Sequence, residues 1–254
     1  MPTLMPDALQ QALALPGLTW LILTIGAAGL VRGFAGFGTA MIFVPVATQF
    51  LPIADVVFLM AATGIASTFA LAPQAWRDCD KVEISTLGFA ATITVPLGLW
   101  IMVQVDSVAL RWVVCGITGL TLLAVVTGWR WEGKLRLPGR LAIGGSAGVV
   151  GGMTGLTGPV VIVFYLASST DVRKIRANTI IFLALLDVVI VFNILISGAA
   201  DLSILWIVLL LCVPYLTTTL IGKALFDPRL ERIYRLAAYS VILIAVISGL
   251  PLLD

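Results

Sequence analysis

The sequence predicts an all-α integral membrane protein made of two inverted repeats, each with one re-entrant helical hairpin and three transmembrane helices. Three observations support this prediction. Of the 254 residues, 60% are hydrophobic and only 11% are charged, whereas a soluble domain carries about 25% charged residues. Apolar runs long enough to cross a bilayer follow one another along most of the chain. A glycine-rich interruption in the first half recurs in the second half.

The first repeat begins with an apolar region, Gly17–Phe50, that is interrupted by GLVRGFAGFGT at 29–39. As one helix it would be about 50 Å long, too long for one crossing of about 30 Å and too short for two. Because glycine opens helices, we expect two short helices that meet at a glycine-rich tip inside the membrane. Three stretches of spanning length follow: Ile53–Ala72, Ile84–Val103 and Val108–Trp129.

The second repeat has the same order of elements. Its first apolar region, Leu141–Ala167, is interrupted by GVVGGMTGLTGP at 148–159, so a second hairpin is expected for the same reason. Three stretches of spanning length follow again: Arg176–Ser197, Leu202–Leu225 and Leu230–Leu252.

Matches between the halves place the first repeat at 1–131 and the second at 132–254. Internal duplication of this kind is common in secondary transporters. Gly29, Gly33 and Gly36 match Gly148, Gly152 and Gly155 at an offset of 119, and Asp106, Arg111 and Gly128 match Asp227, Arg232 and Gly249 at 121. Weaker matches join Ala61 and Thr63 to Ala177 and Thr179 at 116, and Pro96 to Pro214 at 118.

The basic residues indicate that the repeats are inverted. If all eight apolar regions crossed the membrane, the basic residues would divide almost evenly between its faces. If both glycine-broken regions return to their own side, 13 of the 15 lie on one face, Arg111 lies on the other and Arg32 lies at a hairpin tip. The positive-inside rule favours this arrangement. We therefore expect the protein to lie in the inner (plasma) membrane, with both termini outside and the basic loops in the cytoplasm. The 13 are Arg77, Lys81, Arg130, Lys134, Arg136, Arg140, Arg173, Lys174, Arg176, Lys223, Arg229, Arg232 and Arg235.

The two hairpin tips are expected to meet near the bilayer midplane and to form an anion site. Thr39 can cap the helix after the first tip, and Pro159 is suited to the first position of the helix after the second. Helix N-termini present free N–H groups and positive dipole ends. The candidate substrate-binding residues are Arg32, Gly33, Phe34, Gly36, Phe37, Gly38 and Thr39 at the first tip and Gly152, Thr154, Gly155, Thr157 and Gly158 at the second.

These candidates also have structural interpretations. The guanidinium of Arg32 matches the oxygen geometry of sulfonate, sulfite, phosphate or carboxylate, but the side chain could instead snorkel to a surface or pair with Asp187. Phe34 and Phe37 could be ordinary packing residues. The glycines could serve close helix packing through GxxxG motifs.

Asp187 is the clearest titratable group within a predicted span. It lies near the centre of Arg176–Ser197, and an acid at that depth is a functional hypothesis by default. Burial disfavours its charged form, so we expect Asp187 to accept and release a proton that is coupled to transport. The alternatives are that it balances Arg32 or fixes a helix contact. Asn178 and Asn193 share its helix as weaker polar candidates.

The composition excludes several other classes of protein. A mean hydropathy of +1.12 leaves too little polar surface for a water-soluble domain. The chain has no histidine, which excludes a histidine-containing catalytic triad and a histidine-ligated metal site. A net charge of +2 argues against a nucleic-acid partner. We therefore expect no enzyme activity, no metal and no cofactor.

The two glycine-rich regions resemble those of the TauE/SafE sulfite exporter family. The residues that carry this resemblance are GLVRGFAGFGTAMIFVPV and GGSAGVVGGMTGLTGPVVIVFYL, and the chain length agrees. The resemblance implies a multi-pass permease that moves sulfite, sulfonates or other small organic anions without ATP hydrolysis. The family often has more consecutive glycines at the first tip, where this chain has Phe37-Gly38-Thr39.

The leading hypothesis is a secondary transporter that moves a small anion across the bilayer by alternating access, with protons as the candidate coupling ion. The alternatives are a passive anion channel, a permease for a non-sulfur carboxylate, and a membrane assembly factor without transport. The sequence does not specify the exact substrate, the direction of transport or whether the protein forms a homodimer.

Overall fold

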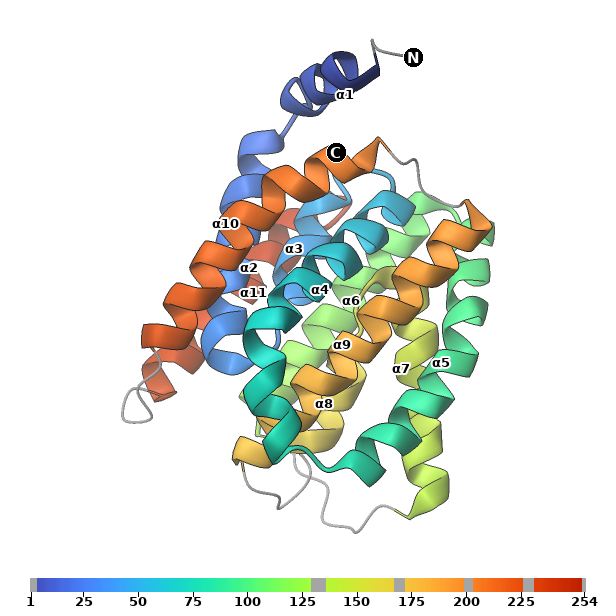
Figure 1. The fold of residues 1–254 in the computed structure, drawn as a ribbon, viewed down its shortest axis with the longest axis vertical. Coiled ribbons are helices and arrows are strands. Elements are labelled where there is room, and N and C mark those ends of the chain that lie inside the picture. Colours follow the sequence, from blue (N-terminus) through green and yellow to red (C-terminus); the bar gives the residue numbers. More distant parts are fainter. Residues whose placement is uncertain (1–3, 129–135, 167–171, 199–202, 226–230, 253–254) are drawn as a thin grey trace.

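The computed structural model describes residues 4–128, 136–166, 172–198, 203–225 and 231–252, which form a helical bundle (Figure 1). The prediction of an all-α protein is confirmed for these residues. The helices are α1 (Leu4–Leu13), α2 (Leu18–Ala35), α3 (Thr39–Ala47), α4 (Ile53–Asp78), α5 (Lys81–Gln104), α6 (Ser107–Val126), α7 (Leu137–Thr154), α8 (Pro159–Leu166), α9 (Val172–Ser197), α10 (Ile204–Leu225) and α11 (Glu231–Gly249).

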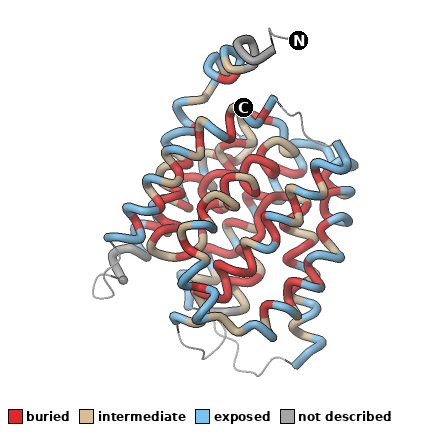
Figure 2. The backbone as a smooth tube through the Cα atoms, viewed as in Figure 1, coloured by how far each residue is buried: buried red, intermediate tan, exposed pale blue. Residues whose placement is uncertain are grey.

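Six of the described helices are long and apolar enough to cross a membrane: α2, α4, α5, α6, α9 and α10. Five of them fall on predicted spans, whereas the sixth predicted span corresponds to α11, whose apolar part, Leu236–Gly249, is shorter. Large apolar side chains such as Trp20, Phe89 and Phe192 are exposed. Figure 2 shows buried residues in the interior and exposed residues on the outer helix faces. A bilayer is the solvent that suits this surface.

The first glycine-rich region is broken into helices of unequal length. α2 has 18 residues and α3 has nine, which correspond to about 27 and 14 Å. Between them, Gly36 and Gly38 have φ values of 80° and 99°, a left-handed conformation that favours glycine. Gly17 lies directly against the Phe50 ring, so the two ends of the region lie together. The expectation of two short helices therefore holds for α3, whereas α2 has nearly the length of a full crossing.

The second glycine-rich region is broken at the equivalent place. α7 has 18 residues and α8 has eight, and Gly155 after α7 has a φ of 75°. α8 begins at Pro159, as predicted. The capping prediction for Thr39 is wrong: the N-cap of α3 is Gly38, and Thr39 is already the first helical residue.

Helix contacts between the two halves occur in matched pairs. α2 packs against α10 as α7 packs against α5, and α3 packs against α11 as α8 packs against α6. α4 packs against α10 as α9 packs against α5, and α4 and α9 also pack against each other. If α2 to α6 are taken to correspond in order to α7 to α11, each of these contacts has its equivalent in the other half. This is the pattern expected of two equivalent halves.

Small residues bring the α2 and α10 backbones together. Gly29 lies against the Thr218 side chain and the Tyr215 carbonyl, and Gly33 lies against the backbone at Gly222. A Cβ atom at either glycine would overlap these atoms. Close helix packing through small residues is a common interface in membranes, so this part of the structural interpretation of the glycines is confirmed.

The α5–α7 crossing repeats this arrangement. Gly148 lies against Thr94 and the Ala91 carbonyl, and Gly152 lies against the backbone at Gly98. Thr94 and Gly98 of α5 precede their counterparts on α10 by 124 residues. The two crossings thus use the same residue types in the same order.

Two of the sequence matches do not correspond in the packing. The sequence match of Pro96 with Pro214 has an offset of 118 residues. The residues that pack in the same way on α5 and α10 are instead 124 residues apart. Gly249 lies in α11 against the backbone of Pro45, whereas Gly128 follows α6 with a φ of 66°, and a Cβ atom there would meet no described residue within 4 Å. Asp106 accepts a hydrogen bond from the Ala109 amide and caps α6. Its proposed counterpart Asp227 and the side chain of Arg232 lie outside the described residues.

One end of the bundle, called the basic end below, contains the helix ends that carry basic residues. In Figure 1 the C-terminal ends of α4 and α10 and the N-terminal ends of α5, α7 and α9 lie there, opposite the N-terminus of the chain. Lys174 Nζ lies 2.9 Å from Asp80 Oδ2, and Lys223 Nζ donates to the Ala70 carbonyl over 3.0 Å. The hydrogen bond from Lys174 lowers the pKa of Asp80. Arg130, Lys134, Arg229 and the side chain of Arg235 lie outside the described residues.

Candidate functional site

A small cavity lies where the two glycine-rich breaks face the middle of α4, α9 and α10. Its volume is about 30 Å³, enough for about two water molecules. The residues that line it are Arg32, Gly38, Thr39, Ala40 and Met41 from the first region, Val57, Met60, Ala61 and Gly64 from α4, Gly155, Thr157, Gly158, Pro159 and Ile162 from the second region, Leu183, Asp187 and Ile190 from α9, and Tyr215 from α10.

Arg32 places a buried positive charge on the wall of this cavity. It lies in the last turn of α2 and is only 4% exposed. Within the described part of the chain, its Nε and Nη2 atoms have no hydrogen-bond partner. A buried polar group without a partner is costly, and a guanidinium offers a planar fork of N–H donors. The position therefore suits a ligand with acceptor oxygens.

Two helix N-termini also face the cavity. The first intrahelical bonds run from the Ile42 amide to the Gly38 carbonyl in α3 and from the Ile162 amide to the Gly158 carbonyl in α8. The amides of the first turn have no intrahelical partner, and the N-cap of α3 has no side-chain hydrogen bond. Each terminus carries the positive end of a helix dipole. Together with Arg32, these groups give one side of the cavity a positive potential.

Asp187 places an acidic side chain on the wall of the same cavity. It is 7% exposed, lines the cavity from α9 and lies directly against Gly64 of α4. Among the described residues, Asp187 forms no ion pair with Arg32, since no nitrogen–oxygen distance between them is within 4.0 Å. The direct pairing considered from the sequence is therefore absent from this structure.

A chain of hydroxyl groups runs along the wall. Thr39 Oγ1 lies 3.1 Å from Tyr215 Oη, which in turn lies 3.5 Å from Ser67 Oγ. Ser67 donates to the Gly64 carbonyl over 2.8 Å. The chain joins α3, α10 and α4, so it connects the two halves beside Asp187.

Comparison with known proteins identifies the family. Residues 21–249 match the family described as Sulfite exporter TauE/SafE. The chain belongs to this family. No curated protein and no solved structure matches it. The match begins within α2 and runs to the end of α11, and it confirms the resemblance found in the two glycine-rich regions.

Membership makes the chain a multi-pass membrane transporter and not an enzyme. Within the described residues, no cluster of three or more Cys, Asp or Glu side chains could hold a metal ion.

The structure brings about half of the predicted site residues to the cavity. From the first tip these are Arg32, Gly38 and Thr39, and from the second they are Gly155, Thr157 and Gly158, joined by Asp187 of α9. Both tips thus contribute to one space, although they are separated by more than 100 residues in the chain.

The other glycine candidates are placed by packing. Gly33 and Gly152 lie against α10 and α5, and the Gly33 carbonyl accepts a hydrogen bond from Arg176 Nη2 over 2.8 Å. Gly36 turns the chain after α2 and lies against the Arg176 side chain. These residues support the tips without lining the cavity.

The remaining candidates also lie away from the cavity. Phe34 and Phe37 are partly buried and pack against the hydrophobic core. Thr154 donates to the Val150 carbonyl and accepts from the Leu156 amide, so its hydroxyl stabilises the local turn. The two asparagines also make other contacts: Asn178 accepts from the Asp80 amide and Asn193 donates to the Val189 carbonyl.

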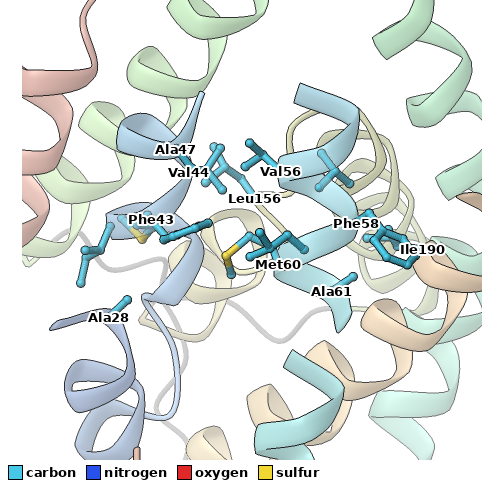
Figure 3. Packing of buried hydrophobic residues seen from close by; sticks show 14 of the residues in the cluster. Ala28, Phe43, Val44, Ala47, Val56, Phe58, Met60, Ala61, Leu156 and Ile190 are labelled. Atoms are coloured by element: carbon cyan, nitrogen blue, oxygen red, sulfur yellow. The ribbon is translucent and has the colours of Figure 1, made fainter. Parts of the chain in front are cut away.

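Buried apolar residues seal one side of the site. Figure 3 shows Phe43 and Val44 of α3 and Met60 and Ala61 of α4 among the buried hydrophobic residues of the core. Phe43 and Val44 are fully buried, and Met60 and Ala61 line the cavity. This packing keeps bulk water away from the polar groups, which strengthens their electrostatic interactions.

Proposed function

We propose that this TauE/SafE transporter moves a small sulfur oxyanion, sulfite or a sulfonate, and binds it between the two helix N-termini and Arg32. One observation carries the proposal: the buried guanidinium of Arg32, with Nε and Nη2 unbonded within the described residues, lines the same cavity as the starts of α3 and α8. Sulfur enters through the family name alone. The geometry of the site suits any small oxyanion, so a carboxylate is the alternative substrate.

The mechanism we propose is alternating access by two inverted repeats with re-entrant hairpins. The matched helix contacts support it, because each half uses a broken helix against a spanning helix of the other half. A cavity of about 30 Å³ must widen to admit a sulfonate. At the basic end, the Lys174–Asp80 ion pair and the hydrogen bond from Arg176 to Gly33 would have to part for that side to open.

Asp187 is proposed to couple the anion to a proton. Arg32 and Asp187 face the same cavity, and we propose that the carboxyl group of Asp187 is ionised only while Arg32 has no bound anion. An anion bound at Arg32 disfavours a second negative charge nearby, and the carboxyl group of Asp187 would then take up a proton. One proton would thus accompany each monoanion.

We also propose that the basic end of the bundle faces the cytoplasm, as the positive-inside rule predicts.

Counterflow in proteoliposomes tests the proposal. Vesicles preloaded with unlabelled sulfite should accumulate labelled sulfite above its external concentration, because a carrier exchanges one substrate molecule for another. An imposed inward proton gradient should also drive uptake. Sulfite equilibration without accumulation would indicate a passive channel instead. Transport of acetate with no transport of sulfite or a sulfonate would assign a carboxylate permease.

A further inference from the structure

The hydroxyl chain beside the cavity has fewer protons than the hydrogen bonds it could form. Each hydroxyl group has one proton to donate and two lone pairs to accept. Ser67 gives its proton to the Gly64 carbonyl, so its oxygen can only accept from Tyr215. Thr39 has no other hydrogen-bond partner among the described residues, and either Thr39 or Tyr215 can donate in the bond between them.

Two arrangements of the protons follow. In the first, Thr39 donates to Tyr215 and Tyr215 donates to Ser67, so no proton points into the cavity. In the second, Tyr215 donates to Thr39, and the proton of Thr39 is free to point into the cavity, which Thr39 lines. The distances favour the second arrangement, because the Tyr215–Thr39 contact is 3.1 Å and the Tyr215–Ser67 contact is 3.5 Å.

We infer that Tyr215 is a positioning residue, which aims the hydroxyl of Thr39 at the bound oxyanion by donating its own proton to Thr39. The inference rests on the proposed function. Thr39 then acts as a second donor beside Arg32, contributed by the first turn of α3. Tyr215 is fully buried, and its hydroxyl has no described partner other than Thr39 and Ser67. The second half thereby controls a substrate contact made by the first.

Equilibrium binding of labelled sulfite to the purified full-length protein in detergent tests the inference. Thr39→Val removes the donor and should weaken binding by about 10-fold or more, the range for a hydrogen bond to a charged group. Thr39→Ser keeps the hydroxyl and should bind within about twofold of wild type. Tyr215→Phe should weaken binding less than Thr39→Val, because the hydroxyl of Thr39 remains but is no longer oriented.

The decisive comparison is Tyr215→Phe in the Thr39→Val background. If Tyr215 acts only through Thr39, it adds no further loss there. An additional loss equal to that of the single Tyr215→Phe variant would overturn the inference, since Tyr215 would then act independently of Thr39. A Thr39→Ser variant that binds as weakly as Thr39→Val would also overturn it.

The Ser67→Ala variant should change sulfite affinity in the opposite direction to Thr39→Val and Tyr215→Phe. It removes the competing acceptor of Tyr215, so sulfite should bind at least as tightly as to wild type, and up to about twofold tighter if the two arrangements are equally populated. The Gly64 carbonyl keeps a second donor, Thr68 Oγ1 at 3.0 Å. Thr63→Ala, one turn earlier on α4, is the matched control because the hydroxyl of Thr63 bonds only to its own helix. Weaker binding by Ser67→Ala than by Thr63→Ala would contradict the inference.

Thermal unfolding of each variant separates a binding defect from misfolding, and affinities are compared per folded molecule. Wild type that binds no sulfite or sulfonate would overturn the proposed function and this inference with it. Wild type that binds sulfite and loses binding on Arg32→Gln, with additive losses for Thr39 and Tyr215, would overturn the inference alone.

Discussion

At the scale of single residues, Gly64 allows α4 to approach the carboxylate of Asp187. A Cβ atom at position 64 would overlap both the carboxylate oxygen and the carboxyl carbon of Asp187. The Gly64 carbonyl also accepts from Ser67 and Thr68. One small residue thus determines where the acid stands relative to the cavity and to the hydroxyl chain.

We predict that Gly64→Ala displaces Asp187 and lowers proton-driven sulfite uptake by about 10-fold. That factor equals about 1.4 kcal/mol in the free energy of the transport step. Uptake into proteoliposomes, normalised to folded protein, measures the effect. Gly26→Ala is the control, because a Cβ there meets only Thr218 Cγ2 at an ordinary 3.8 Å. Equal uptake by the two variants would show that the contact with Asp187 has no role.

The sequence identified the charged members of the site better than its hydroxyl members. Arg32 and Asp187 stand out because charges are rare at membrane depth, and the structure places both at the cavity. Tyr215 gave no local signal, since a tyrosine within an apolar helix is ordinary and its partner Thr39 lies 176 residues away. Only the three-dimensional contact between α10 and α3 shows its place.

At the scale of helices, the bundle depends on two crossings at which small residues meet. α2 and α10 approach at Gly33 and Gly222, and α7 and α5 approach at Gly152 and Gly98. Apolar helices in lipid gain no hydrophobic driving force from each other, so close packing is a main source of their association. Each crossing also holds a broken helix in place at the cavity.

We predict that Gly152→Ala lowers the free energy of unfolding by about 1–3 kcal/mol, because the new methyl group would overlap the carbonyl oxygen of Val95 on α5. Gly33→Ala should have a similar effect at the other crossing. Thermal unfolding in detergent measures the loss. Gly116→Ala in α6, where a Cβ atom would meet no described residue within 4 Å, should have a free energy of unfolding equal to or slightly above that of wild type. A loss at Gly116 as large as at Gly152 would refute the packing explanation.

Helix positions were predictable from apolar length, but helix ends and arm lengths were not. The predicted breaks at the glycine clusters occur, because Gly36 and Gly38 permit the left-handed backbone conformation at the first break. No sequence pattern explains why α2 continues to Ala35 while α3 ends after nine residues. That difference depends on contacts with α10 and α11, which lie in the other half of the chain.

At the scale of the whole molecule, the proposed inverted arrangement predicts that the two ends of the bundle face opposite compartments. Cysteine labelling in intact cells tests this, in a background that lacks Cys79, Cys115 and Cys212. A cysteine at exposed Gln10 should react with an impermeant reagent, and one at exposed Arg136 should react only after permeabilisation. Labelling of both sites from the same side would refute the arrangement.

We propose that the anion binds at the cavity beside Arg32, and a comparison of two buried arginines provides a matched test of this claim. Arg32 is 4% exposed and lines the cavity, whereas Arg111 is 9% exposed, lies outside it and donates to the Gly249 carbonyl. Sulfite counterflow is measured for Arg32→Gln and Arg111→Gln, normalised to folded protein. We predict a loss of at least about 10-fold for Arg32→Gln and near wild-type counterflow for Arg111→Gln. Wild-type counterflow by Arg32→Gln, or equal losses in both variants, would contradict the claim.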